Sequence, residues 1–304
     1  MSILVVGEAL IDRVTVADGP EAAHVGGSPL NVAVGLARLG VPTTFASQVG
    51  RDAHGEQILQ RLRASGATFS ALPPTPRRTA TAIATVSDDG SARYAFDLSW
   101  DPVILPEVDT FDALHLGSVA TVLQPGANRL AELAAAARRH GVAVSFDPNV
   151  RLAVEPDASA WRRTCARIVP HAGVVKLSAD DAAVLFPGLG PAAVADRLAG
   201  EDRLAVVTCG AGGAHAATPA ARAHVASAAT DLVDTIGAGD AFMAALIAWL
   251  VGHDQPAARD LASADLDDLL TFAAAAAAIT CARPGADPPW TADLQRLQPT
   301  GERP

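Results

Sequence analysis

The chain has 304 residues, of which 50% are apolar and 18% are charged, and its formal net charge at pH 7 is −10. This length fits one large α/β domain with a substantial core. The negative charge argues against nucleic acids and anionic membranes as partners. A small phosphorylated ligand stays compatible with it, because such a ligand is held by local donors.

Cysteine usage and apolar runs indicate where the protein works. Cys165, Cys209 and Cys281 lie far apart without a CxxC pair, which is typical of reduced thiols in a reducing compartment. The opening run "MSILVVGEALID" lacks a basic region and predicts a strand rather than a signal peptide. The apolar stretches near 241–251 and 272–282 are too short to span a bilayer. We expect a cytoplasmic protein without a membrane partner.

Short apolar runs alternate with helical patterns along the chain. The runs predict strands at Ile3–Val6, Thr43–Val49, Ala113–Leu116, Val142–Phe146, Val174–Leu177 and Leu204–Thr208. Helical patterns between them cover, among others, 29–39, 127–140, 159–168 and 191–199. This alternation favours an α/β fold with a doubly wound, mostly parallel sheet and helices on both faces. No repeat or linker divides the sequence, so we expect a single domain over 1–304.

Two β-rich segments interrupt this alternation. Residues 78–98 alternate with period two around Asp89-Gly90, which predicts a β-hairpin. Residues 13–25 predict another short strand pair. We interpret segments 13–25 and 78–100 as a small β-lid on the α/β body, with an edge hairpin of no functional role as the alternative.

The stretch "GGSPLNVAVGLARLG", 26–40, predicts a helix with defined ends. Ser28 is expected to cap its N-terminus, Pro29 suits the first helical position and Gly40 closes it. These three residues are explained by local structure alone.

Other residues of this stretch offer ligand contacts. Gly26 and Gly27 leave exposed backbone ahead of the helix, and Asn31 presents amide donors and an acceptor on its first turn. Asp12, which we place at the end of the first strand, can accept two hydroxyl hydrogens. Such groups suit a ligand rich in neutral hydroxyls.

The stretch "DTIGAGDAF", 234–242, sets nearly bare backbone before a buried helix that Gly252 is placed to end. Gly237, Ala238 and Gly239 leave the N–H groups at the helix N-terminus open to an anion. A carboxylate there does not help to bind an anion. We therefore interpret Asp240 as a general base that deprotonates an attacking hydroxyl. A simple helix cap after a flexible loop is the alternative.

These two motifs, in this order, resemble the signatures of the PfkB, or ribokinase-like, carbohydrate kinases. The likeness covers nearly the whole chain, and "VSFDPNVR", "VVKLSADDAAVLFPG" and "VTCGAGGA" lie where the family has its other motifs. "GEALID" together with "FDPNVR" is most similar to the fructokinase branch.

The resemblance implies a ribokinase-like fold with a lid over the sugar, and transfer of the ATP γ-phosphoryl group to a sugar hydroxyl, most simply that of fructose. Asp240 matches the catalytic base, and the bare backbone before it matches the anion hole. Positions that hold the sugar are matched by Asp12, Gly26, Gly27 and Asn31.

The resemblance also implies contacts for the nucleotide and for cations. Thr208, Gly210 and Gly213 match the strand and turn that contact ATP. Lys176, which ends a strand, is a candidate for the phosphates, with a structural role as the alternative. Asp234 and the carbonyl of Ile236 match a monovalent-cation site, which makes K⁺ a candidate besides Mg²⁺. Two copies of such a chain are expected to pair through their lids.

The sequence departs from the family pattern in one motif. The family's Asn-x-x-Glu motif, linked to Mg²⁺, reads Ser-x-x-Asp from Ser178 to Asp181. Asp181 keeps a shortened carboxylate, and Mg²⁺ is expected to enter with ATP. The alanines of 272–286, which match the helix beside the adenine, offer no side chain that can read the base.

Several rival functions fail on the sequence. It contains neither a P-loop nor HExxH, and no G-x-G-x-x-G follows the first strand. Two alternatives remain. In a 2-keto-3-deoxygluconate-type kinase, Arg151 would bind the carboxylate of the sugar acid. The other interpretations of Arg151 are a contact with a phosphate and a surface ion pair. The chain is alternatively a sugar-binding sensor without catalysis.

Overall fold

The computed structural model describes residues 1–16, 22–86, 92–200, 202–228, 232–255, 258 and 261–296. Its centre is a nine-stranded sheet with the order β13-β12-β11-β10-β9-β8-β1-β4-β5. These strands are β1 (Ile3–Val6), β4 (Thr43–Ser47), β5 (Thr68–Ala71), β8 (Ala113–Gly117), β9 (Ala143–Asp147), β10 (Val174–Ser178), β11 (Leu204–Thr208), β12 (Ala214–Ala217) and β13 (Arg222–Val225).

The sheet confirms the six predicted strands with ends that differ by a residue or two. All pairings from β5 to β11 are parallel, and only β12 and β13 pair antiparallel at one edge. These two edge strands and β5 were not predicted. They are four residues long, and β12 reads "AHAA", which lacks the β-branched residues typical of strands.

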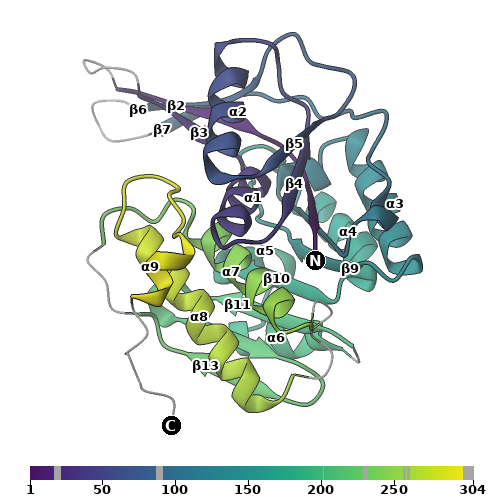
Figure 1. Ribbon diagram of the computed structural model, residues 1–304, viewed down its shortest axis with the longest axis vertical. Coiled ribbons are helices and arrows are strands. Elements are labelled where there is room, and N and C mark those ends of the chain that lie inside the picture. Colours follow the sequence, from purple (N-terminus) through teal and green to yellow (C-terminus); the bar gives the residue numbers. More distant parts are fainter. Residues whose placement is uncertain are drawn as a thin grey trace.

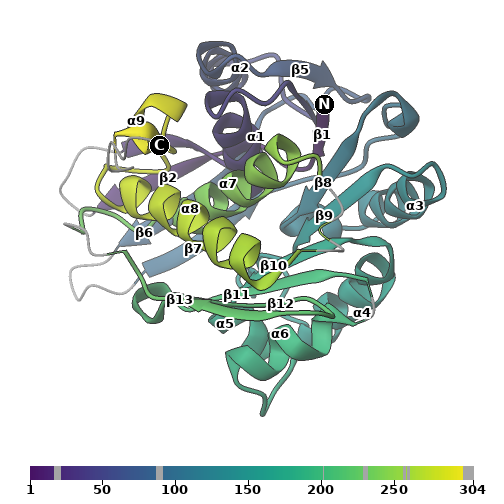
Figure 2. The ribbon, with the colours of Figure 1, turned by 60° about the horizontal axis from the view of Figure 1, so that its bottom comes forward.

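Helices cover both faces of this sheet, as predicted. Figure 2 shows α7 and α8 on one side of the sheet and α4, α5 and α6 on the other. Side chains alternate between the two cores: Ile3 and Val5 pack toward the first layer, and Leu4 and Val6 toward the second. The first layer holds α1 (Ser28–Arg38), α2 (Ala53–Ser65), α7 (Ala238–Gly252) and α8 (Ser263–Cys281); the second holds α3 (Gly126–Arg139), α4 (Ala158–Ile168), α5 (Ala179–Leu185) and α6 (Pro191–Ala199).

The last helix of the described residues, the short α9 (Thr291–Gln295), lies against α8. In the parts of the chain described, no helix combines the length and the apolar character needed to cross a membrane.

A separate four-stranded sheet projects from one end of the body (Figure 1). Its order is β3-β2-β6-β7, and both predicted strand pairs are present in it. The parallel pairing of β2 with β6 joins the two segments, which the sequence did not predict. Residues 17–21 and the turn at Asp89-Gly90 lie outside the described residues. The strands are β2 (Leu10–Val16), β3 (Ala22–Gly26), β6 (Ala80–Val86) and β7 (Ala92–Asp97).

Asp12 was misplaced by the sequence analysis. The first strand ends at Val6, and Asp12 lies inside β2, opposite His24 of β3. The error arose because "ILVVGEALID" reads as one apolar run. A turn through Gly7 and Glu8 divides it between two sheets. That the chain forms a single domain over 1–304 stays a prediction. So does the pairing of two copies through their lids.

The strand order places a crevice at the carboxyl ends of the strands. The chain passes from β1 to β4 and β5 on one side, and later fills the other side from β8 to β13. In open α/β sheets, ligands bind where the order reverses in this way.

Helices α1 and α7 approach each other closely beside this crevice. A Cβ atom placed on Gly35 of α1 would lie 2.7 Å from the Cβ of Ala244 on α7, which is shorter than real contacts between such atoms. The contact between the second half of α1 and the middle of α7 therefore leaves room only for glycine at position 35.

We expect Gly35→Val to lower the free energy of unfolding by about 1–3 kcal/mol, because the added atoms overpack this contact. Urea unfolding followed by circular dichroism measures the change. Gly252→Ala is the matched control: it lies at the end of α7, and its Cβ would meet nothing within 4 Å among the described residues. The control should stay within about 0.5 kcal/mol of the native chain. Equal stability of both variants would contradict the close packing.

Candidate active site

One cavity of about 1400 Å³ opens at the carboxyl ends of the strands. Its wall runs from the second sheet, through the N-termini of α1 and α7, to the turn after β11 and the alanine-rich face of α8. Pockets for a single small ligand usually have about 300–1,000 Å³. This cavity therefore has room for two ligands side by side.

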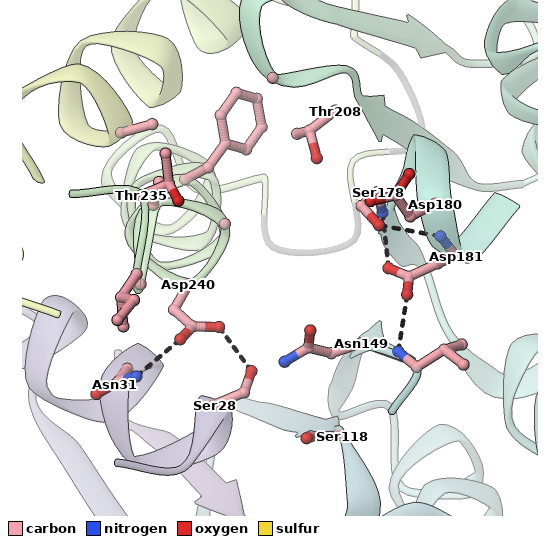
Figure 3. Close-up of a pocket in the computed structure, with 18 of the residues that line it drawn as sticks. Ser28, Asn31, Ser118, Asn149, Ser178, Asp180, Asp181, Thr208, Thr235 and Asp240 are labelled. Atoms are coloured by element: carbon pink, nitrogen blue, oxygen red, sulfur yellow. Dashed lines mark hydrogen bonds between the residues drawn. The ribbon is translucent and has the colours of Figure 1, made fainter. Parts of the chain in front are cut away.

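Asp240 stands in the middle of this cavity, on the first turn of α7 (Figure 3). Only 8% of it is exposed. One carboxylate oxygen accepts a hydrogen bond of 2.6 Å from the hydroxyl of Ser28, and the other accepts one of 2.8 Å from the amide of Asn31. Burial raises the pKa of Asp240 above its ordinary value, against these two bonds and the charge of Lys176, which lower it. A raised pKa suits a group that must accept a proton near neutral pH.

The backbone before Asp240 is nearly bare, and at Gly237 its surroundings leave no room for a side chain. Gly237 is the N-cap of α7 at φ +77°, and a Cβ on it would lie 2.5 Å from the Cβ of Ala286. A Cβ on Gly239 would lie 3.0 Å from the ammonium nitrogen of Lys176. Among the described residues, none accepts a hydrogen bond from the backbone N–H of Gly239 or Asp240. Free N–H groups at the N-terminus of a helix are suited to an anion.

The lid side of the cavity presents Asp12. A Cβ on Gly26 would lie 2.1 Å from a carboxylate oxygen of Asp12, so glycine leaves the space that this carboxylate fills. Burial raises the pKa of Asp12, while the charges of His24 and Arg151 lower it. Asp12 and the exposed Arg151 both line the cavity. The structure thus brings these two predicted residues to the same end.

Gly27 and Asn31 also line this end. Gly27 has a φ of +109°, and a Cβ on it would lie 2.7 Å from the carbonyl oxygen of Glu8. The amide nitrogen of Asn31 is engaged by Asp240, a contact other than the predicted one with a ligand hydroxyl.

Lys176 forms a buried ion pair near Asp240. Its nitrogen lies 2.9 Å from Asp147, and the two side chains are 5% and 1% exposed. Burial by itself lowers the pKa of Lys176, but the ion pair outweighs it and the pKa lies above its ordinary value. The ammonium group is therefore charged where it meets Gly239 and the cavity.

The predicted nucleotide residues line the far end of the cavity. Thr208 ends β11, and Gly210 and Gly213 lie in the turn that follows. Gly213 has a φ of +81°, and a Cβ on it would lie 1.9 Å from the carbonyl oxygen of Val225. Opposite this turn, α8 contributes Ala274 and its neighbours to the wall.

Asp181, the candidate metal ligand, carries structural hydrogen bonds. One carboxylate oxygen accepts from the backbone N–H of Val150 at 2.8 Å and the other from that of Ser178 at 2.9 Å. The second bond belongs to a capping box at the start of α5. Burial and the charge of Asp147 raise the pKa of Asp181. Its carboxylate is thus engaged before any metal arrives.

Asp234, at the predicted monovalent-cation site, also accepts two backbone hydrogen bonds, as Asp181 does. Its oxygens accept from the backbone N–H of Ile236 at 3.0 Å and of Gly285 at 2.9 Å, and the first of these bonds lowers the pKa of its carboxyl group. The described residues contain no group of three His, Cys, Asp or Glu side chains placed to hold a metal ion. These residues do not fit a protein cage for Mg²⁺.

Three residues of the site were missed or misread from the sequence. Ser28 is not the N-cap: Gly27 takes that place, and the hydroxyl of Ser28 turns to Asp240 instead. Glu8 follows β1, is 6% exposed and accepts from the N–H of Ala120 at 3.0 Å; burial raises its pKa to about 7. Asp147 ends β9. Glu8 and Asp147 were findable, because carboxyl ends of parallel strands meet at one edge of a sheet.

Comparisons with known proteins agree with this geometry. The family model described as pfkB family carbohydrate kinase matches residues 1–293. A fructokinase of Klebsiella pneumoniae is 31% identical over 303 residues, which cover 97% of this chain and 98% of that protein. The match thus spans nearly the whole length of that fructokinase.

Solved structures agree on the fold. A fructokinase of Vibrio cholerae, described as bound to fructose, ADP and a potassium ion, has a TM-score of 0.81 and 27% identity, with 97% of each chain covered. A fructokinase of Xylella fastidiosa with bound ATP has a TM-score of 0.81 and 28% identity, again with 97% of each chain covered. The predicted α/β fold is confirmed, and the chain belongs to the pfkB family of carbohydrate kinases and is a sugar kinase.

Proposed function

We propose that this kinase transfers the γ-phosphoryl group of ATP to a hydroxyl of fructose. The observation that carries the proposal is the buried Asp240 carboxylate beside the N–H groups of Gly239 and Asp240, for which the described part of the chain offers no acceptor. A proton acceptor and an anion-binding site thus adjoin within one cavity. The similarity to several fructokinases, including the fructose-bound and ATP-bound ones, supports the choice of both substrates.

Asp240 accepts the proton of the sugar hydroxyl as its oxygen attacks the γ-phosphorus, and ADP leaves. The N–H groups of Gly239 and Asp240, which have no acceptor among the described residues, stabilise the charge on the phosphoryl oxygens. The Lys176 ammonium adds positive charge against Gly239. Mg²⁺ supplies charge neutralisation on the nucleotide phosphates when it is bound.

The sugar lies between Asp12, the turn at Gly27 and the second sheet, which acts as a lid. Ala82 and Phe96 of that sheet line the cavity, which supports this placement. ATP lies at the other end, along Thr208 and the turn at Gly210. Closure over the sugar excludes water and limits wasteful hydrolysis of ATP.

Two cations accompany the reaction. Mg²⁺ would come with ATP, and the loop of Asp234 with the carbonyl of Ile236 would hold K⁺ and supply positive charge near the N-terminus of α7. The potassium ion bound to the Vibrio cholerae fructokinase supports the second cation. Asp234 ties this loop to Gly285, so an ion there acts on the backbone that leads to Asp240.

A second substrate is favoured by one observation. Arg151 is exposed at the sugar end of the cavity and its charge acts on Asp12. A guanidinium group there can meet the carboxylate of 2-keto-3-deoxygluconate. A sensor without catalysis is less consistent with the retained Asp240 and its free amides.

ADP release with Mg-ATP should respond strongly to fructose, and K⁺ should stimulate it. The panel contains fructose, ribose, tagatose, 2-keto-3-deoxygluconate and a nucleoside, each with and without K⁺. A response to the sugar acid alone would favour the second substrate. Silence across the panel would contradict the proposal.

Asp240→Asn should lower kcat about 10²–10⁴-fold, because a general base contributes this range. Steady-state assays with the responding sugar measure the loss, and the melting temperature shows whether the variant is folded. Asp196→Asn is the control, since this exposed carboxylate pairs with Arg222 away from the cavity lining. Near-native turnover of Asp240→Asn would disprove the assignment.

Asp12→Ala should raise the KM for the sugar about 10–100-fold, as expected for the loss of a hydrogen bond to a charged group. The KM for ATP should change little, because Asp12 lies at the lid end. Both constants come from initial rates at varied sugar and varied ATP. An effect confined to ATP would contradict the placement of the sugar.

A further inference from the structure

The first turn of α1 meets the first turn of α7 at Asp240. Ser28 and Asn31 are three positions apart, so both project from the same face of α1. Figure 3 shows the two side chains reaching Asp240 from either side, each with a hydrogen bond to its own oxygen. The sequence analysis singled out Asn31 for a ligand hydroxyl and Ser28 for the helix cap, and the contacts of both with Asp240 became visible only in the structure.

The carboxylate keeps room for a substrate in this arrangement. An ionised carboxylate has about four acceptor positions on its two oxygens. Ser28 and Asn31 take one on each oxygen, which leaves the others for a sugar hydroxyl. The contact therefore orients the base without blocking it, as a third group orients the base in other hydroxyl-activating sites.

We propose that Ser28 is a positioning residue for the general base: its hydroxyl keeps the Asp240 carboxylate ionised and turned toward the acceptor hydroxyl. The inference rests on the proposed function, because it requires Asp240 to accept the proton. It assigns Ser28 a part in the reaction that a role in capping α1 would not include.

Burial makes this hydrogen bond important for the charge state of Asp240. The carboxylate is 8% exposed, and burial alone raises the pKa of Asp240. A short hydrogen bond to the charged form opposes that rise. Ser28 donates at 2.6 Å, the shorter of the two bonds to Asp240.

Other charged groups face Asp240 from the elements packed around it. Lys176 of β10 lowers the pKa of Asp240, and Asp147 of β9 raises it. Glu8, after β1, and Arg61 of α2 also interact with it electrostatically. Glu8 is the one that can imitate the expected effect, since its own pKa is about 7.

The test measures the chemical step in Ser28→Ala across pH. Removing the hydroxyl takes away a contribution that lowers the pKa of Asp240, so that pKa rises further. The base is then protonated up to a higher pH, and the acid limb of the single-turnover rate should move upward by about one pH unit. The KM for the sugar should change little. Rapid-quench measurement of sugar phosphate avoids limitation by product release.

Three further variants separate this role from a structural one. Ser28→Thr keeps the hydroxyl, so the acid limb of its pH–rate profile should lie at the native pH and not at that of Ser28→Ala. Pro29→Ala disturbs the start of the same helix without removing a contact with Asp240, so the acid limb of its pH–rate profile should stay at the native pH. The Ser28→Ala shift should persist in a Glu8→Gln background. Melting temperatures show which variants are folded.

Specific outcomes overturn the inference. If the acid limb of the pH–rate profile of Ser28→Ala lies within about 0.3 pH units of the native one, the hydrogen bond from Ser28 does not set the charge state of Asp240. An equal shift of the acid limb in Pro29→Ala would assign the effect to helix packing. Loss of the Ser28→Ala shift in the Glu8→Gln background would assign it to Glu8. When one of these outcomes is found and Asp240→Asn still loses turnover, the role of Ser28 is wrong but the assignment of Asp240 as the base stands. If Asp240→Asn keeps turnover, the proposed base fails with it.

Discussion

The structure depends on a buried carboxylate at the N-terminus of a buried helix. Asp240 is tolerated there because α1 supplies two hydrogen-bond donors, and because Gly35 lets α1 and α7 approach closely. The same approach leaves the amides of the α7 N-terminus facing the cavity. Packing of two helices thus places a proton acceptor and an anion site side by side.

Charge balance around this point explains several other residues. Asp147, Asp181 and Asp240 lie near one buried ammonium group, that of Lys176. Asp181 is further stabilised by two backbone N–H groups at the start of α5. The cluster is net negative when all these groups are charged, so the free amides at the N-terminus of α7 and the Lys176 ammonium are the groups in it that attract an anion.

The cavity separates two tasks at its two ends. The lid end presents carboxylate, amide and guanidinium groups, which suit a hydroxylated ligand. The far end presents glycine turns and the alanines of α8, which admit a large planar group but offer no side-chain hydrogen bonds to it. Asp240 lies between them, where a hydroxyl from one side and a phosphoryl group from the other can meet.

The sequence by itself determined the periodic part of this protein: the six central strands, the helices between them, the two lid strand pairs and the bare stretch before Asp240. Local hydrophobic periods and glycine patterns specify these features. Only the tertiary structure decided that Asp12 lies in the second sheet, that Ser28 donates to Asp240 instead of capping its own helix, and that Lys176 pairs with Asp147. These contacts join residues far apart in the chain, and no local pattern specifies which buried polar groups will meet.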